Sequence, residues 1–176
     1  IYSHEKLDMS QVYLWTRQAF EGDLALEFEF MPLRENGLSL LCLQASGMQR
    51  EDFMRDHPLR TTGSMEVVYN ENVRNYHFEF FREMDDCRND VASFGLIKEH
   101  WQHPLAYACL PRRLEHGRWH RLQFVQEGSR LRAGVDGRLL FDVQDDGMGG
   151  HGPILQCGHI GLRCMYKSHL AYRNMR

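Results

Sequence analysis

The stretch "WHRLQFVQEGSRLRAGVDGRLLFDV", residues 119–143, contains three short segments in which apolar and polar residues alternate. A period of two residues is typical of a half-buried β-strand, because successive side chains point to opposite faces. The segments are separated by the turn sequence "EGS" and by Asp136-Gly137, which favours a tight hairpin because both central residues of that turn need positive φ. The stretch therefore predicts two consecutive hairpins of an antiparallel sheet.

The same alternation recurs along the chain. It is found in "DLALEFEF" (23–30), "GLSLLCLQA" (37–45), "SMEVVYN" (64–70), "YHFEFFRE" (76–83), "GHIGLRCM" (158–165) and "HLAYRNM" (169–175). Helical periodicity is confined to "QREDFMRD" (49–56), which predicts a turn or two of helix. We count about ten or eleven regularly spaced strands, which predicts an all-β, antiparallel two-sheet sandwich of the jelly-roll type in one domain over residues 1–176.

Composition excludes several classes of protein. The 176 residues carry a net charge of −3, so there is no basic excess for nucleic-acid phosphates. No apolar run approaches the roughly 18 residues that a membrane helix needs. Five cysteines, an odd number without a CxxC motif, predict reduced and mostly buried thiols. Reduced thiols favour a cytoplasmic location. The chain starts at Ile1 without a methionine, so either it was processed or residues before Ile1 are not shown, and secretion stays open as the alternative.

Two sets of motifs carry a family resemblance. The segment "GRWHRLQFVQEGSRLRAGVDGRLLFDVQDD", followed by "GHIGLRCMYKSHLAYRNM", resembles the end of concanavalin A-like lectin/glucanase domains. Motifs in order along nearly the whole chain, among them "VYLWTRQAF", "LRTTGSMEVVYN" and "YHFEFFRE", resemble the YesU-like family. The resemblance implies a concanavalin A-like fold and a bacterial protein of plant-polysaccharide utilisation, particularly of rhamnogalacturonan. It also implies that an N-terminal segment with an edge strand is missing from the sequence.

The chain departs from this family in its middle. Where the family has a basic "NLRK…GFHL" stretch, this sequence has "CRNDVASFGLIKEH". Arg88 corresponds to the family arginine, but Gly95 stands at the family's histidine position. The resemblance also places a histidine at His77 and an arginine at Arg82.

A uronate ligand sets the chemistry that the site must supply. Its carboxylate needs a cation, preferably a bidentate arginine, and the substrate-binding candidates are Arg60, Arg74, Arg82 and Arg88. Elimination next to the uronate needs an acid/base group, and the catalytic candidates are His77, Tyr69 and Glu66. Strict alternation puts His77 and Arg82 on opposite faces of the strand, so they converge only if a bulge intervenes. The alternative is a histidine hydrogen-bonded within the sheet and an arginine in a surface ion pair.

Three further features of the sequence bear on ligand binding and catalysis. Trp101, in "EHWQHP", is expected in a long loop, where its indole either stacks on a sugar or pins the loop to the core. Glu79 and Glu83 share a strand face, but their Cα atoms lie roughly 13 Å apart, too far for a glucanase carboxylate pair. Asp145 and Asp146 form either a turn or a structural Ca²⁺ site. No other cofactor is expected.

These patterns lead to three functional hypotheses. The first is a carbohydrate-recognition or accessory protein for uronate-containing plant polysaccharide, which binds an oligosaccharide or polysaccharide on the concave sheet face. The second is a lyase or hydrolase that acts on uronate-containing oligosaccharides. The third is a structural partner without a sugar site. The sequence leaves open the oligomeric state, the sugar and the linkage.

Overall fold

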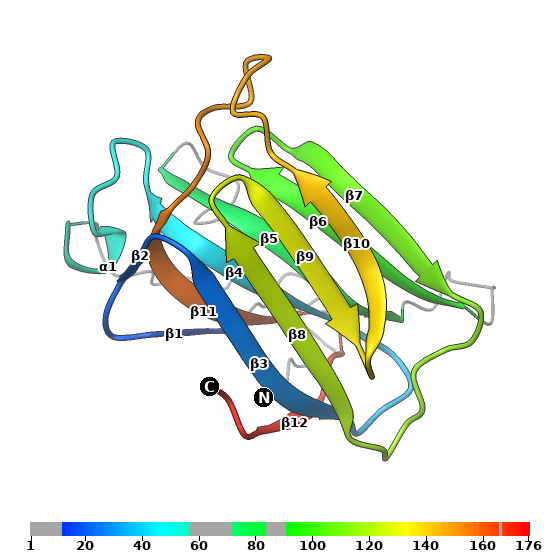
Figure 1. Cartoon of the computed structure of the whole chain (residues 1–176). Coiled ribbons are helices and arrows are strands. Elements are labelled where there is room, and N and C mark those ends of the chain that lie inside the picture. Colours follow the sequence, from blue (N-terminus) through cyan, green and yellow to red (C-terminus); the bar gives the residue numbers. More distant parts are fainter. Residues whose placement is uncertain (1–11, 57–71, 84–90, 166) are drawn as a thin grey trace.

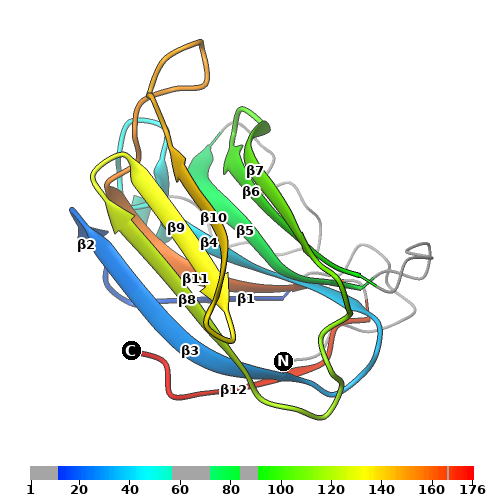
Figure 2. The same cartoon turned by 45° about the vertical axis from the view of Figure 1, so that its right-hand side comes forward.

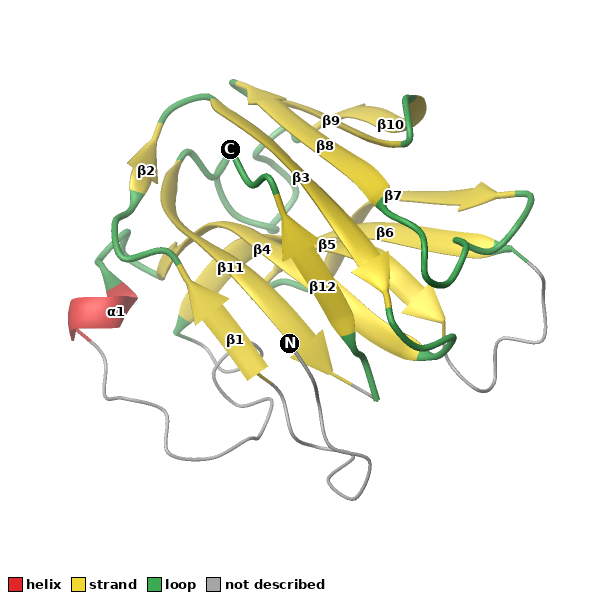
Figure 3. Ribbon diagram, turned by 90° about the horizontal axis from the view of Figure 1, so that it is seen from below, coloured by secondary structure: helices red, strands yellow, loops and turns green. Residues whose placement is uncertain are grey.

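The computed structural model describes residues 12–56, 72–83, 91–165 and 167–176. In this part of the chain two antiparallel β-sheets pack face to face (Figures 1 and 2), which confirms the predicted all-β sandwich. The one helix among these residues is α1 (Phe53–Asp56), the red element of Figure 3, where a turn of helix was predicted. No described helix is long and apolar enough to cross a membrane.

The larger sheet has seven strands in the order β1-β11-β4-β5-β6-β7, with β2 paired to β11. Its strands are β1 (Val12–Trp15), β2 (Phe20–Glu21), β4 (Gly37–Gly47), β5 (Val73–Glu83), β6 (Ala92–Glu99), β7 (His103–Leu110) and β11 (Cys157–Met165). Strands far apart in sequence are therefore neighbours, since β11 lies between β1 and β4.

The smaller sheet has five strands in the order β10-β9-β8-β3-β12. Its strands are β3 (Leu24–Pro32), β8 (His120–Glu127), β9 (Arg130–Val135), β10 (Arg138–Gln144) and β12 (Leu170–Arg173). The two hairpins predicted in residues 119–143 are confirmed as β8-β9 and β9-β10. In the second hairpin Asp136 and Gly137 have φ of 50° and 75°, as a turn of this type requires.

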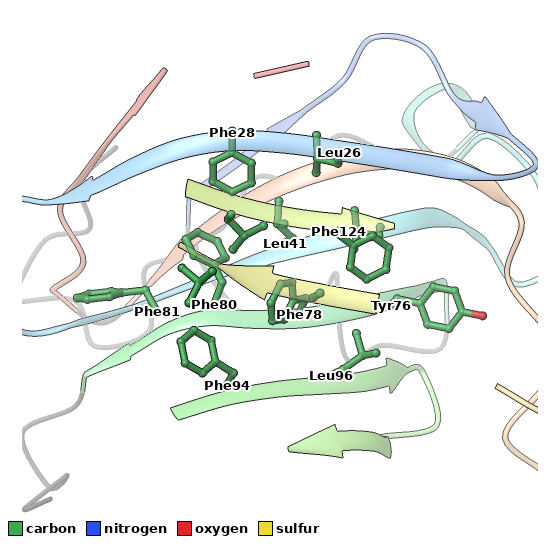
Figure 4. Close-up of a cluster of buried hydrophobic side chains, with 14 of the residues drawn as sticks. Leu26, Phe28, Leu41, Tyr76, Phe78, Phe80, Phe81, Phe94, Leu96 and Phe124 are labelled. Atoms are coloured by element: carbon green, nitrogen blue, oxygen red, sulfur yellow. The ribbon is translucent and has the colours of Figure 1, made fainter. Parts of the chain in front are cut away.

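Aromatic side chains fill the space between the sheets (Figure 4). The rings of Phe30 on β3 and Phe80 on β5 lie 5.0 Å apart edge to face, and Phe78 meets Phe141 of β10 at 5.3 Å. Edge-to-face contacts between buried rings add about 0.5–1.5 kcal/mol each to the hydrophobic term. This packing fixes which face of β5 points inward, and hence which face is left for other chemistry.

The region around Trp101 differs from the sequence expectation. Instead of a long loop, a tight turn at His100–Gln102 joins β6 to β7. Strand β6 is covered on both faces, so it lacks the alternation that reveals a half-buried strand. The strand predicted at residues 64–70 lies outside the described residues.

Candidate functional site

A β-bulge decides which side chains of β5 share a face. Ser39 of β4 pairs with Phe81, but the next residue, Leu40, pairs with Glu79, so Phe80 is the extra residue. The bulge shifts the alternation by one position. Arg82 thereby joins Glu79, and its Nη1 donates to Glu79 Oε1 at 3.0 Å. The bulge thus puts Arg82 on the same face of β5 as Glu79 and His77, where Arg82 contacts Glu79 and lies five residues along the strand from His77.

Strand register aligns six residues across this outer face of the seven-stranded sheet. We call them the Glu79 row, and in order from β1 to β7 they are Tyr13, Arg163, Leu40, Glu79, Gly95 and Tyr107. The row holds an aromatic ring at each end with a cation and an acid between them. Aromatic faces combined with a few charged groups are the usual components of a polar ligand site.

Gly95 makes the acidic end of the row possible. A Cβ at this position would lie 3.0 Å from Glu79 Oε2 and 3.2 Å from Tyr107 Cε1. The missing side chain therefore leaves room for the carboxylate and the phenol ring to approach one another. Tyr107 is 69% exposed, which is unusual for a large ring and leaves a face open to solvent.

Arg163 supplies a buried cation at the other end of the Glu79 row. Its side chain is fully buried, and its guanidinium carbon lies 5.4 Å from the centre of the Tyr13 ring. That geometry is a cation–π contact, which stabilises a charge that has been removed from water. The sequence signal for Arg163 is a single charge inside the largely apolar "HIGLRCM".

A second group of polar side chains lies beside the Glu79 row. His77 Nδ1 meets Glu99 Oε1 at 3.1 Å, and both side chains are 2% exposed. Asn75, fully buried, is the register partner of Glu99. We call Asn75, His77 and Glu99 the buried polar trio. His77 Nε2, Glu99 Oε2 and both amide atoms of Asn75 have no hydrogen-bond partner among the described residues.

Covalent chemistry finds little support at this face. Cys42 is the register partner of His77, so a thiol and an imidazole lie on neighbouring strands, and the imidazole contacts the Glu99 carboxylate. Burial, however, raises the pKa of the Cys42 thiol to about 12, so the nucleophilic thiolate is not formed near neutral pH. Glu79 and Glu99 are on neighbouring strands but four positions apart in register, again roughly 13 Å between Cα atoms. That is wider than a glycosidase carboxylate pair.

The other predicted site residues lie elsewhere or outside the described part. Arg74 donates from Nε to Ser46 Oγ at 3.2 Å, three positions from His77 and hence on the opposite alternation. Arg60, Glu66, Tyr69 and Arg88 lie outside the described residues. Of the predicted set, the structure puts His77 and Arg82 on one face of β5, with Glu79 between them. Their ligand roles stay predictions.

Trp101 is packed away from the trio, at one end of the sandwich. It is partly buried against the core, and a Cβ on Gly152 would lie 2.2 Å from its ring. The Lys98 ammonium lies 5.6 Å from the ring centre and forms a fully buried ion pair with Asp145 at 2.7 Å. The indole thus holds the β6-β7 turn against the loop before β11, and a sugar-stacking role for it stays a prediction.

The possible Ca²⁺ ligands have other partners. Asp145, Asp146 and His151 bring one ligand atom each to within 4.8 Å of one another. Asp145 Oδ2 already accepts hydrogen bonds from Lys98 and, at 2.7 Å, from the Tyr76 hydroxyl, and Oδ1 accepts one from the Gly147 amide. A cation would compete with Lys98 for this carboxylate, so the geometry disfavours the calcium hypothesis, which stays a prediction.

Sequence reasoning missed Glu99, Arg163 and Tyr107. Exposed and covered residues alternate along much of β7, but this pattern is known only from the structure. Glu99 had no comparable signal, because its contact with His77 depends on how β6 pairs with β5.

The fold places the protein among the galectin-like and concanavalin A-like β-sandwiches. A crystal structure from Bacillus subtilis, described as a protein of unknown function with galectin-like fold, superposes with a TM-score of 0.84 at 23% identity, over 96% of this chain and 77% of that one. The carbohydrate-binding module CBM66 from Bacillus subtilis gives a TM-score of 0.58 at 12% identity, over 99% and 89%.

The family follows from the sequence comparison. The chain belongs to the family described as Domain of unknown function (DUF1961), whose model matches residues 2–176. It is also similar to the uncharacterized protein YesU of Bacillus subtilis (strain 168), with 22% identity over 169 residues, which are 95% of this chain and 76% of YesU.

Proposed function

We propose that the protein is a carbohydrate-binding protein that recognises an oligosaccharide on the outer face of the seven-stranded sheet. The observation that carries this proposal is the Glu79 row, in which the exposed Tyr107 ring lies beside the Glu79–Arg82 pair. An exposed aromatic ring provides an apolar surface for the C–H face of a sugar, and neighbouring charged groups bind its hydroxyls. The fold shared with a carbohydrate-binding module supports the proposal.

The finer proposal is a preference for uronate-containing chains such as rhamnogalacturonan. Arg82, whose side chain is 40% exposed, is an accessible cation among the described residues of this face. A ligand carboxylate competes with Glu79 for its guanidinium, and planar guanidinium–carboxylate pairs are specific as well as strong. The resemblance to the YesU-like family suggested the polymer, and Arg82 is the residue that would select its acid group.

The test compares two ligands that differ in one group. Binding of rhamnogalacturonan oligosaccharides is measured by calorimetry, beside the same oligosaccharides after carboxyl reduction, which converts each uronate to a neutral sugar. We expect the acidic ligand to bind at least tenfold more tightly, equivalent to about 1.4 kcal/mol. The incubated ligand is also analysed for unsaturated uronate and new reducing ends, which would reveal catalysis.

Matched variants locate the binding face. Tyr107→Ala is expected to lower affinity about tenfold without changing the unfolding midpoint, because the ring is exposed. Leu139→Ala removes a similarly exposed apolar side chain, 66% exposed, from the other sheet and should leave binding unchanged. Equal loss in both variants, or none in either, would contradict binding on the seven-stranded sheet.

A further inference from the structure

The three most buried histidines of the described chain differ in one respect. His120 uses both ring nitrogens, with Asp136 Oδ2 2.8 Å from Nδ1 and the Glu115 carbonyl 3.0 Å from Nε2. His159 does the same, with the Thr16 carbonyl and Asp52 Oδ1 both at 2.9 Å. His77 is equally buried, yet only its Nδ1 has a partner among the described residues.

This difference has an energetic meaning. A buried polar atom without a hydrogen bond costs about 1–3 kcal/mol, and native proteins leave few such atoms. Here three adjacent side chains have such atoms. Glu99 Oε2 and both amide atoms of Asn75 lack a partner among the described residues, as His77 Nε2 does. Unmet groups that gather in one place indicate an occupant that satisfies them together.

The Glu99 carboxylate determines what that occupant must offer. A carboxylate that is ionised only accepts, so in a pair of ionised Glu99 and neutral His77 the shared hydrogen lies on His77 Nδ1 and Nε2 is an acceptor. The open atoms of the trio are then three acceptors, namely Nε2, Glu99 Oε2 and Asn75 Oδ1, with a single donor, Asn75 Nδ2. Such a set fits hydroxyl groups, which donate and accept. It repels a carboxylate, which has no hydrogen to donate and carries the same charge as Glu99.

We propose that Asn75, His77 and Glu99 form a hydroxyl-binding subsite in which an O–H group donates to His77 Nε2. This subsite rests on the proposed carbohydrate function and gives the ligand an orientation. The neutral, hydroxyl-bearing part of the sugar lies at the trio, and its acidic group lies toward Arg82, which pairs with Glu79. Two sources can supply the O–H group, a ligand hydroxyl or an internal water.

The tautomer and the ligand contact are both visible in one experiment. Long-range ¹H–¹⁵N NMR of the ¹⁵N-labelled protein reports which ring nitrogen of each histidine carries hydrogen. We expect His77 to be protonated on Nδ1 and bare on Nε2. On addition of rhamnogalacturonan oligosaccharides the His77 Nε2 resonance should move, whereas His120, whose two nitrogens are already bonded, should not.

Variants extend the test to affinity. His77→Gln is expected to weaken oligosaccharide binding about tenfold, and His116→Gln, which changes an exposed histidine, is expected to leave it unchanged. Because His77→Gln can also disturb folding, the wild-type NMR result decides on its own.

The possible failures are distinguishable. Oligosaccharide that binds while His77 Nε2 stays unmoved overturns the subsite and assigns the O–H to water, but leaves the proposed function standing. A hydrogen on His77 Nε2 in the free protein also overturns the proposed subsite, and it leaves the proposed carbohydrate function standing. Absence of any oligosaccharide binding overturns the proposed function and the subsite with it.

Discussion

The two sheets differ in how far their charged side chains are exposed and paired. On the outer face of the five-stranded sheet, acids and arginines are partly exposed and paired with one another, as in Glu29 with Arg173 at 2.9 Å and Asp142 with Arg130 at 2.6 Å. A hollow of about 460 Å³ lies there, but the charges that line it, such as Glu27 with Arg121, already neutralise each other. On the seven-stranded sheet, His77 and Glu99 are buried and have open hydrogen-bonding atoms.

The difference shows on which sheet a ligand can form new favourable hydrogen bonds. Exposed ion pairs contribute little because water solvates each partner almost as well as the other partner does. Buried polar groups have lost their water and depend on a specific partner. The hollow on the five-stranded sheet is therefore the weaker candidate site, and the face with unmet polar atoms is the stronger one.

The largest effect is predicted for the buried ion pair of Lys98 and Asp145. Lys98→Met removes the ammonium from a fully buried ion pair and leaves the Asp145 carboxylate with weaker partners. We expect a loss of about 3–5 kcal/mol in the free energy of unfolding, measured in urea. Arg130→Met, which breaks an exposed pair with Asp142, serves as the matched control and should give no measurable change. Similar losses in both variants would remove the distinction between the sheets.

An intermediate effect is predicted for Glu83 at the end of β5. Burial raises the pKa of Glu83 to about 7 from 4.5, although Arg113 lies 3.3 Å away and opposes the shift. Between these two pH values the folded protein binds more protons than the unfolded one, so stability falls as pH rises from 4.5 through 7. Glu83→Gln should abolish this decline and stabilise the protein at pH 8 by up to about 3 kcal/mol.

The measurement is urea unfolding at several pH values between 4 and 8, for wild type and variant. Glu35→Gln changes an exposed acid and provides the control. A decline that persists unchanged in Glu83→Gln would show that another group causes it.

The smallest effect is predicted on the five-stranded sheet. Hydrogen bonds from Arg121, joined by Arg176 and Gln123, lower the pKa of Glu27 to about 2 from 4.5. A lowered pKa means that the contribution is present above pH 4.5 and is lost as pH falls toward 2. Because the pair is exposed, Glu27→Gln should change the unfolding midpoint only slightly at neutral pH, and 1 M salt should remove that change. A large, salt-insensitive fall in the unfolding midpoint would contradict the conclusion that the ion pairs of this face are exposed and contribute little to stability.

Much of the architecture follows from local sequence patterns. The alternation in residues 23–30 and 119–143, with Asp136-Gly137 between two strands, predicted β3, β8, β9 and β10 and their hairpins. Strands β6 and β7 were not predicted. Strand β6 is covered on both faces, so its sequence lacks the alternation of apolar and polar residues that marks a half-buried strand. Of the candidate site, His77 and Arg82 were named from the sequence, but their placement on a common face needed the bulge at Phe80.

By itself the sequence determined that the chain forms an antiparallel sandwich, because strand alternation and turn residues act over only a few positions. The tertiary structure alone decided that Glu99 meets His77, that Arg163 and Tyr107 lie in one row with Glu79, and that polar atoms of the trio have no partner among the described residues. These contacts depend on register between strands up to 120 or so residues apart, which the packing of the aromatic core and one bulge set together.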